Sequence, residues 1–243
     1  MDALSLYRAG HLREAIDALG DELKKQPLDT KRRTFLFELL CFAGEYDRAI
    51  KHIDLLSDSS PEAAAGAMLY RAAIHAERER QDMFANNKLP LGSEHPASSG
   101  ELNGEEFSGL TDGDPRIGQN LEAFIAGSYT WIPFAYIESI ETEPPKRLRD
   151  LLWMPAILTT TSDFRLQDLG EVLLPVISPL SWKHSDDAVR LGRATVWEED
   201  PQHGDIPLGQ KLLLLGDEEE PFLQLRKLTF HHAGERAESA AAR

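Results

Sequence analysis

A spacing of 34 residues links two stretches near the start of this chain. A glycine in each stretch lets the backbone turn tightly, alanines let two helices approach closely, and a proline marks the next helix start. Because the match covers both sides of the turn, we favour a true repeat over a chance likeness of two amphipathic hairpins. The matching residues are Leu6, Ala9, Gly10, Ala15, Ile16 and Pro27, which return as Leu40, Ala43, Gly44, Ala49, Ile50 and Pro61.

The length of the repeat predicts the architecture of residues 1–84. Units of 34 residues that form a helix, a turn and a second helix are typical of tetratricopeptide-like arrays, which bind other proteins. Apolar residues keep a helical spacing on both sides of each repeated glycine. A third pair is expected from Pro61, although Arg78 and Met83 stand where the repeat would place glycine and alanine. We therefore expect a tetratricopeptide-like helical domain over residues 1–84.

The composition changes after this helical part. Residues 86–115 are rich in asparagine, glycine, proline and serine, and their acidic residues meet no base between Lys88 and Arg116. Such a composition favours an extended, solvated segment. We expect residues 85–115 to be a flexible acidic linker or insert, and residues 233–243 to be a disordered tail.

Residues 116–232 have the pattern of a second, mostly β domain of α/β type. A short helix is expected over residues 118–126, another over residues 146–152 after a proline pair, and an acidic hairpin turn over residues 216–221. The chain is thus expected to be an α+β protein, with a helical repeat domain followed by a mostly β domain. Runs of aromatic and branched residues predict strands at 129–137, 156–161, 172–177, 194–197, 211–215 and 222–230.

The charge of the chain limits the partners it can take. It carries 41 acids and 26 bases, and residues 85–243 hold 26 of the acids and 14 of the bases. A negative field of this size repels phosphate backbones and anionic headgroups, so neither nucleic acid nor a membrane is an expected partner. No apolar stretch approaches the ~18–20 residues of a membrane span, and the single cysteine, Cys41, suits a reducing compartment. We expect a cytoplasmic protein that binds other proteins.

No residue pattern in the sequence points to catalysis, a metal or a cofactor. The eight histidines show no metal-binding spacing, and the adjacent His231 and His232 are expected on opposite faces of one strand. Asp112 and Asp114 alternate as at the start of a calcium loop, but the other ligands are missing. Phosphate-binding glycine loops and serine nucleophile motifs are absent. A hydrolase built on the acidic C-terminal part is an alternative that a pocket with convergent carboxylates would support.

Tryptophans stand in compact groups with arginine, proline and glycine in the second half of the chain. Large aromatics beside glycine and proline most often form the core of a small sheet, so these are expected in the C-terminal core rather than on a binding surface. A core arginine needs a carboxylate partner, and we expect Asp150 to pair with Arg190 or Arg193. The tryptophans concerned are Trp131, Trp153 and Trp197.

Six motifs along the chain stand out as a set, at residues 35–44, 112–122, 131–133, 151–156, 190–197 and 208–210. Together they resemble the ImpE/TagJ family over residues 1–84 and 107–230, in order. Family members usually have further helical sequence where this chain has residues 86–106, and a basic residue where Met154 stands. The motif residues, for which we expect a structural role, are Arg116, Gly118, Trp131, Pro133, Asp150, Trp153, Pro155, Arg190, Gly192, Arg193, Trp197, Gly209 and Gln210.

The resemblance implies an accessory protein of bacterial type VI secretion systems, with a helical N-terminal domain and an α/β C-terminal domain. Family members are described as binding the N-terminal helix of the small contractile-sheath subunit, and as linked through it to the ClpV unfoldase. We then expect an adaptor that captures an amphipathic helix in a groove with an acidic rim. A generic tetratricopeptide-like scaffold for another cytoplasmic complex is the alternative.

The expected partner-binding surface is the concave face of the repeat, which the first helix of each hairpin lines. Two clear repeats are short for a helix of ~15 residues, which is ~22 Å long. We therefore expect a composite site that the C-terminal domain completes. The register places on the concave face Lys31, Thr34, Glu38 and Cys41 and, 34 residues later, Ala65, Met68, Ala72 and His75.

Overall fold

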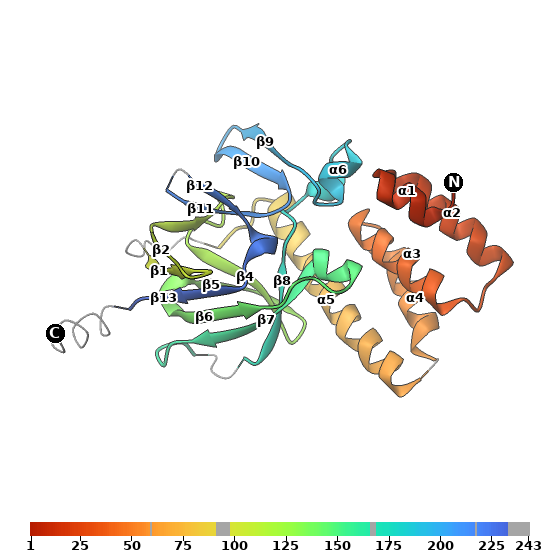
Figure 1. The fold of residues 1–243 in the computed structure, drawn as a ribbon, viewed down its shortest axis with the longest axis horizontal. Helices are drawn as coiled ribbons and strands as arrows, with labels where there is room; N and C mark the ends of the chain where they lie inside the picture. Colours follow the sequence, from red (N-terminus) through yellow and green to blue (C-terminus); the bar gives the residue numbers. More distant parts are fainter. Residues whose placement is uncertain (59, 91–97, 166–168, 217, 233–243) are drawn as a thin grey trace.

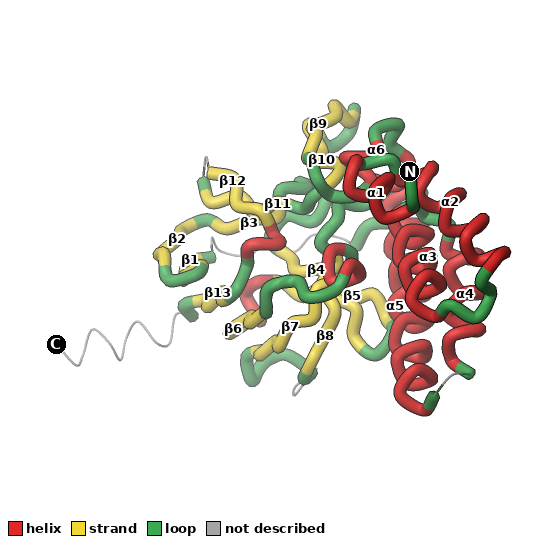
Figure 2. Tube along the Cα trace, turned by 45° about the vertical axis from the view of Figure 1, so that its right-hand side comes forward, coloured by secondary structure: helices red, strands yellow, loops and turns green. Residues whose placement is uncertain are grey.

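The computed structural model of the chain describes residues 1–58, 60–90, 98–165, 169–216 and 218–232. The helical part and the strands lie on opposite sides of the molecule, and the long helix α5 lies between the other helices and the sheet (Figures 1 and 2). The expected α+β class is confirmed. No helix in the described ranges is long and apolar enough to cross a membrane.

The helices before residue 86 begin and end at residues with clear local preferences. Asp2, Asp29 and Ser60 each accept a backbone hydrogen bond at the start of a helix. Gly10 and Gly44 follow helices in the left-handed conformation, with φ of 89° and 70°. The helices are α1 Ala3–Ala9, α2 Leu12–Lys25, α3 Thr30–Phe42, α4 Tyr46–Ser57 and α5 Pro61–Ala85.

The expected third helix pair is wrong. α1 pairs with α2 and α3 with α4, but α5 runs without a break from Pro61 to Ala85. Arg78 occupies the position that Gly10 and Gly44 hold in the two pairs, so no residue that favours a left-handed backbone is present to end the helix there.

Most strands of the described part belong to one antiparallel sheet, in the order β2-β1-β13-β6-β7-β8-β4-β5. Two small sheets have the orders β12-β11-β3 and β10-β9. The strands are β1 Ser99–Leu102, β2 Glu105–Ser108, β3 Leu110–Asp112, β4 Asn120–Ile125, β5 Ser128–Pro133, β6 Ile137–Thr142, β7 Trp153–Thr160, β8 Glu171–Pro175, β9 Thr195–Asp200, β10 Gly204–Gly209, β11 Leu212–Leu215, β12 Glu218–Pro221 and β13 Lys227–Phe230. Short helices between them are η1 Phe134–Tyr136, η2 Leu148–Leu151, η3 Ser181–Lys183, α6 Asp187–Arg190 and η4 Phe222–Gln224.

Three strands stand where a flexible linker was expected. β1 and β2 form an edge hairpin of the large sheet, and β3 pairs with β11. Their polar composition misled the prediction because only alternate residues, such as Leu102 and Phe107, are buried while their neighbours face solvent. Residues 91–97 of the expected linker and the expected tail at 233–243 lie outside the described residues.

Two further local expectations are wrong. The helix expected over residues 118–126 is strand β4, whose apolar run is buried on both faces and so has no strand-like alternation. The turn expected over residues 216–221 contains strand β12.

Two apolar cores lie on opposite faces of the large sheet. Alternation along β7 separates them: Trp153 joins the helical core, whereas Met154 and Ala156 join the core toward the small sheet of β12, β11 and β3. Phe124 and Leu173 of the sheet also pack in the helical core. The helical part and the sheet therefore share one core.

The tryptophans do not all lie in the C-terminal core as expected. Trp153 is 2% exposed but belongs to the core shared with the helices. Trp131 is half-buried, with its ring centroid 6.1 Å from that of Phe84 on α5. Trp197 is 39% exposed and lies on the two-stranded β9–β10 hairpin, outside the large sheet.

Candidate functional site

A buried ion pair fixes α5 to the large sheet. Arg80 Nε and Nη2 donate to the two carboxylate oxygens of Glu122 on β4, at 2.7 and 3.0 Å, and both side chains are almost fully buried. Two parallel bonds of this kind define an orientation as well as a contact. The Tyr129 hydroxyl donates to Glu122, and Trp131 Nε1 donates to that hydroxyl.

The pair belongs to a larger cluster that contains one more acidic than basic side chain. Lys211 Nζ bonds to Glu122 and lies 2.8 Å from Asp112 Oδ2, so two bases, Arg80 and Lys211, face three acids, Glu77, Glu122 and Asp112. Burial raises the pKa of Asp112 to about 7. Burial opposes ionisation of Glu122 as well, but Arg80 and Lys211 lower its pKa to about 2.

Two tryptophans of the C-terminal part also bond to α5. Trp153 Nε1 donates to Glu77 Oε2 at 3.0 Å. Gln81 Oε1 accepts from the Leu180 backbone at 2.8 Å and from Trp182 Nε1 at 3.2 Å. These bonds satisfy polar groups at a largely apolar junction, as buried polar groups require.

The C-terminal part covers both repeat turns. The Trp182 ring lies against Gly44, where an added Cβ would be 2.6 Å from the ring. The Arg193 guanidinium donates to the carbonyl oxygens of Tyr7 and Arg8, at 2.7 and 3.1 Å, and lies 4.5 Å from the centre of the Tyr7 ring. The repeated glycines are therefore docking points as well as turns.

The expected pairing of Asp150 with Arg190 or Arg193 is wrong. Asp150 Oδ2 accepts the backbone N–H groups of Lys146 and Arg147, each at 2.9 Å, and thereby caps the short helix η2. Arg190 pairs instead with Asp187, three residues away, at 3.2 Å. Asp150 thus bonds to nearby backbone N–H groups, and Arg190 bonds to a nearby aspartate, so the two side chains do not pair with each other.

The face expected to capture a partner helix is partly filled by the chain itself. Glu38 is buried and pairs with Arg149 on η2 at 2.8 Å, and burial raises the pKa of Glu38 despite that pairing. Cys41 is buried and lines a small internal cavity with Leu152 and Trp153. Neither side chain is open to a partner, because η2 and β7 cover this face of α3.

The other expected contact residues are spread over two helices. Lys31 is exposed at the start of α3, and Thr34 is half-buried with its hydroxyl bonded to the Thr30 carbonyl oxygen at 2.9 Å. Met68 and His75 are exposed on α5. Ala65 is exposed on α5, whereas Ala72 is half-buried and packs close to Gly127 in the β4–β5 turn.

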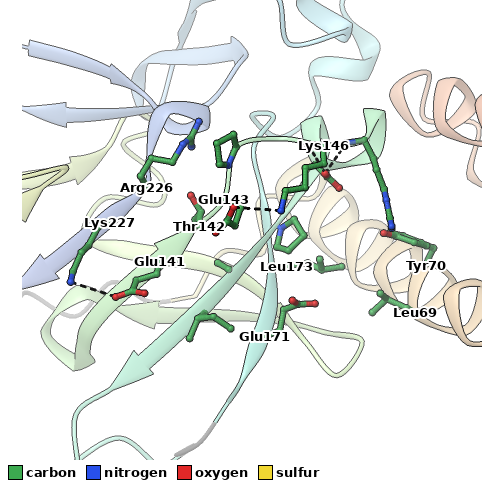
Figure 3. Close-up of a pocket in the computed structure, with 16 residues that line it drawn as sticks. Leu69, Tyr70, Glu141, Thr142, Glu143, Lys146, Glu171, Leu173, Arg226 and Lys227 are labelled. Carbon is green, nitrogen blue, oxygen red and sulfur yellow. Dashed lines mark hydrogen bonds and ion pairs between the residues drawn. The ribbon is translucent and has the colours of Figure 1, made fainter.

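A cleft of about 620 Å³ lies where α5 meets the sheet (Figure 3). Leu69 and Tyr70 of α5 line one end, and Pro155, Ile157 and Leu173 of β7 and β8 line the floor. Leu69 is 45% exposed and Ile157 50%, so both present apolar surface to the cleft. The cleft is formed by α5 and the sheet, whereas the sequence predicted a partner site on the concave face of the repeat that the C-terminal domain completes.

The wall of the cleft is tied to the helical part. Tyr70 Oη accepts from Arg149 Nε at 2.7 Å, and the same guanidinium bonds to Glu38. Arg149 therefore links α3, α5 and η2, and Glu38 acts on the cleft by positioning its wall. None of these contacts is local in sequence.

A second hollow, of about 800 Å³, lies between the β1–β2 and β11–β12 hairpins. Its five glutamates are Glu105, Glu106, Glu218, Glu219 and Glu220. They lie near the surface, without the burial that prepares carboxylates for acid–base chemistry. In the described ranges no three or more histidines, cysteines or acids are placed to hold a metal ion.

The motif residues behind the family resemblance lie mainly at the junction and in turns. Arg116 Nε donates to Asp114 at 2.8 Å, and its guanidinium lies 4.8 Å from the centre of the Phe84 ring on α5. Pro155 lies in β7 beside the cleft. The others in turns or near strand ends are Gly118, Pro133, Gly192, Gly209 and Gln210.

Sequence reasoning missed the residues that build the junction. Glu122 gave a signal, because it is a charged residue inside the otherwise apolar run of β4. Lys211 gave a similar one, beside the four leucines of β11. Arg80 and Gln81 gave none, since polar residues on a helix are ordinary wherever one face is solvated.

These features define a class: an α+β protein whose helical pairs are fixed to an antiparallel sheet, with a cleft at the junction. The ImpE protein family model matches residues 104–229. A Pseudomonas aeruginosa protein described as type VI secretion system accessory component TagJ is 30% identical over 264 residues, covering 95% of this chain and 91% of the relative. The chain therefore belongs to the ImpE family, as its motifs predicted.

A solved structure supports the fold independently. The crystal structure of protein VPA1032 from Vibrio parahaemolyticus matches with a TM-score of 0.81 and 23% sequence identity, covering 95% of this chain and 97% of that one. The likeness extends over both the helical part and the sheet.

Proposed function

We propose that this protein is a type VI secretion accessory component that acts by binding another protein rather than by catalysis. The relationship to the P. aeruginosa accessory component, over nearly the whole of both chains, supports this role. The partner we propose is the N-terminal helix of the small contractile-sheath subunit, in the cytoplasm. Through it the protein would link the sheath to its recycling unfoldase, ClpV.

The observation that carries the proposal is that Leu69 of α5 and Ile157 of β7 line one cleft. An amphipathic helix binds a groove by burying its apolar face there. The exposed side chains of Leu69 and Ile157, together with Leu173 on the floor, offer such a surface. The junction network holds the two walls at a fixed spacing, so ordering the site costs little on binding.

The two helix pairs support a tetratricopeptide-like origin for the helical part. In this proposal the concave face is used for internal docking, by Arg149 on Glu38 and by Trp153, while partner binding moves to the cleft. Met68 is also exposed on α5, but it does not line the cleft.

Binding of the full-length protein to the small sheath subunit tests the proposal. We expect binding to the intact subunit and none after deletion of its first helix. Leu69→Asp is expected to abolish binding, whereas Leu28→Asp is the matched control, because Leu28 is 91% exposed and does not line the cleft. Equal binding with and without the first helix would contradict the proposed mechanism.

A generic scaffold for another complex is the second candidate, supported by the same helix pairs. It predicts no binding of the sheath subunit by the wild type and retained folding of all cleft variants. Affinity capture with the Leu69→Asp protein as the matched negative would then identify the other partner.

A further inference from the structure

The two walls of the cleft carry opposite charges that form no ion pair with one another or with any other described residue. Arg147 and Arg226 form no ion pair with the part of the chain that is described, and Arg226 Nη1 instead donates to the carbonyl oxygens of Leu223 and Leu225. Glu171 on β8 likewise has no ion-pair partner in the described ranges. The cleft thus offers two guanidinium groups and one carboxylate to a ligand.

The charges lie on different sides of the apolar floor. Figure 3 shows Arg226 and Lys146 on one side of Leu173, and Glu171 on the other. In the sheet, Ile157 stands directly between Glu141 and Glu171, its cross-strand neighbours on β6 and β8. Leu173 therefore lies between basic side chains on one side and the Glu171 carboxylate on the other, whereas the second acidic neighbour of Ile157, Glu141, is paired with Lys227.

The other charged residues of the cleft have partners within the protein, since Asp150 accepts two backbone N–H groups and four more side chains form ion pairs. Lys227 lies 3.5 Å from Glu141, and Lys146 lies 3.4 Å from Glu143, so each of these two lysines has an acid beside it. Exposed pairs of this kind contribute little to stability. The unpaired Arg147, Arg226 and Glu171 remain as the groups that gain most from a charged ligand.

We infer that the cleft selects a helix whose apolar stripe is bordered by acidic side chains on one edge and basic side chains on the other. This inference rests on the proposed function and adds the orientation of the helix. The apolar floor supplies affinity, while the two charged edges favour one direction of the helix, because the reversed helix would bring like charges together. The acidic rim expected from the overall charge is replaced here by a rim of both signs.

Charge reversal on the two walls tests the inference with the full-length protein. The probe is a synthetic peptide of the sheath subunit's first helix, titrated against wild type, Arg147→Glu and Glu171→Lys. Both side chains are exposed, so both variants are expected to fold. Each reversal is expected to weaken binding by about tenfold, and a peptide with the opposing charges reversed is expected to restore the affinity.

Controls separate this inference from the proposed function. Lys25→Glu and Glu199→Lys reverse exposed charges outside the cleft and are expected to keep wild-type affinity. If both cleft variants bound the peptide with the affinity of the wild type, the inference would be overturned and the proposed function would stand. Absence of binding to the wild type would overturn both.

Discussion

The indole ring of Trp182 lies directly on Gly44, so close that a Cβ at position 44 would be 2.6 Å from the ring. The glycine of the second helix pair therefore has two roles, since it turns the chain with a φ of 70° and receives a side chain from a segment about 140 residues later. The same relation recurs in weaker form at Gly10, where a Cβ would lie 3.8 Å from Arg193. Docking of the C-terminal part is thus built into the turns of the repeat.

This contact predicts that the two glycines differ in their tolerance of alanine. Gly10→Ala is expected to lower the free energy of unfolding by about 1–2 kcal/mol, because it only strains the left-handed backbone. Gly44→Ala is expected to cost about 1–3 kcal/mol more, because the methyl group also displaces Trp182. Urea denaturation of both variants measures the difference. Equal losses of unfolding free energy in the two variants would show that Trp182 can move away from position 44 at no cost in stability.

Breaking the buried pair between α5 and the sheet is expected to be strongly destabilising. Arg80→Ala leaves Glu122 buried beside Lys211 alone, and the loss is expected to be about 3–5 kcal/mol. Arg78→Ala is the matched control on the same helix, because Arg78 pairs with the exposed Asp47. This substitution is expected to lower the free energy of unfolding by less than about 1 kcal/mol. Comparable unfolding free energies for the two variants would contradict a structural role for the cluster.

Asp112 is expected to make the stability depend on pH. Its folded pKa is raised from 3.8 to about 7, so the folded state holds a proton that the unfolded state releases. The contribution of this carboxyl to stability is therefore greatest below about pH 4 and is lost as the pH rises toward about 7. Glu122 acts in the opposite sense, since its lowered pKa favours the folded state above about pH 4.5 and that stability is lost as the pH falls toward about 2.

Melting temperatures at several values between about pH 5 and pH 8 test this assignment. The melting temperature of the wild type is expected to fall as the pH rises. That of Asp112→Asn is expected to fall less, because this variant carries no ionisable carboxyl at position 112. Asp163→Asn, at an exposed position, is the control and is expected to follow the wild type. A slope for Asp112→Asn identical to that of the wild type would show that another group titrates.

The tryptophans are expected to separate by location. Trp153→Ala removes a buried side chain and its bond to Glu77, and is expected to cost about 3–5 kcal/mol. Trp197→Ala is expected to cost less than about 1 kcal/mol, because the ring is partly exposed on the β9–β10 hairpin. Thermal unfolding of the two variants measures the difference. A loss of stability in Trp197→Ala as large as that in Trp153→Ala would contradict the exposed position of Trp197.

The parts of the fold that the sequence predicted are those set by local rules. Helices α1 to α4 follow from a helical apolar period and from glycines that can only be turns. Strands β5, β7 and β8 carry enough aromatic and branched residues to be recognised. Strand β6 was missed apart from its first residue, and β1 to β3 are short and half-exposed, so their composition resembles that of a linker.

The candidate site was harder to predict because it is made of long-range contacts. Glu38 and Cys41 were placed correctly on one face of a helix, but no local pattern shows that Arg149 and Trp153 cover that face. The pairing of Arg80 with Glu122 joins residues 42 positions apart, through a helix and a strand that were not expected to meet. The cleft exists only as a consequence of that docking.

Site-specific cross-linking tests the central claim, that a partner helix docks between α5 and the sheet, most directly. The chain's single cysteine, Cys41, is buried, so Ile157→Cys introduces one accessible thiol in the cleft, and Leu28→Cys introduces one outside it. Disulfide formation with sheath-subunit helices that carry a cysteine at successive positions is then measured. We expect Ile157→Cys to cross-link to positions on the apolar stripe of the helix and Leu28→Cys to cross-link to none. Docking in the cleft would be contradicted if Ile157→Cys cross-linked equally well to positions on all faces of the helix, or if Leu28→Cys cross-linked more efficiently than Ile157→Cys.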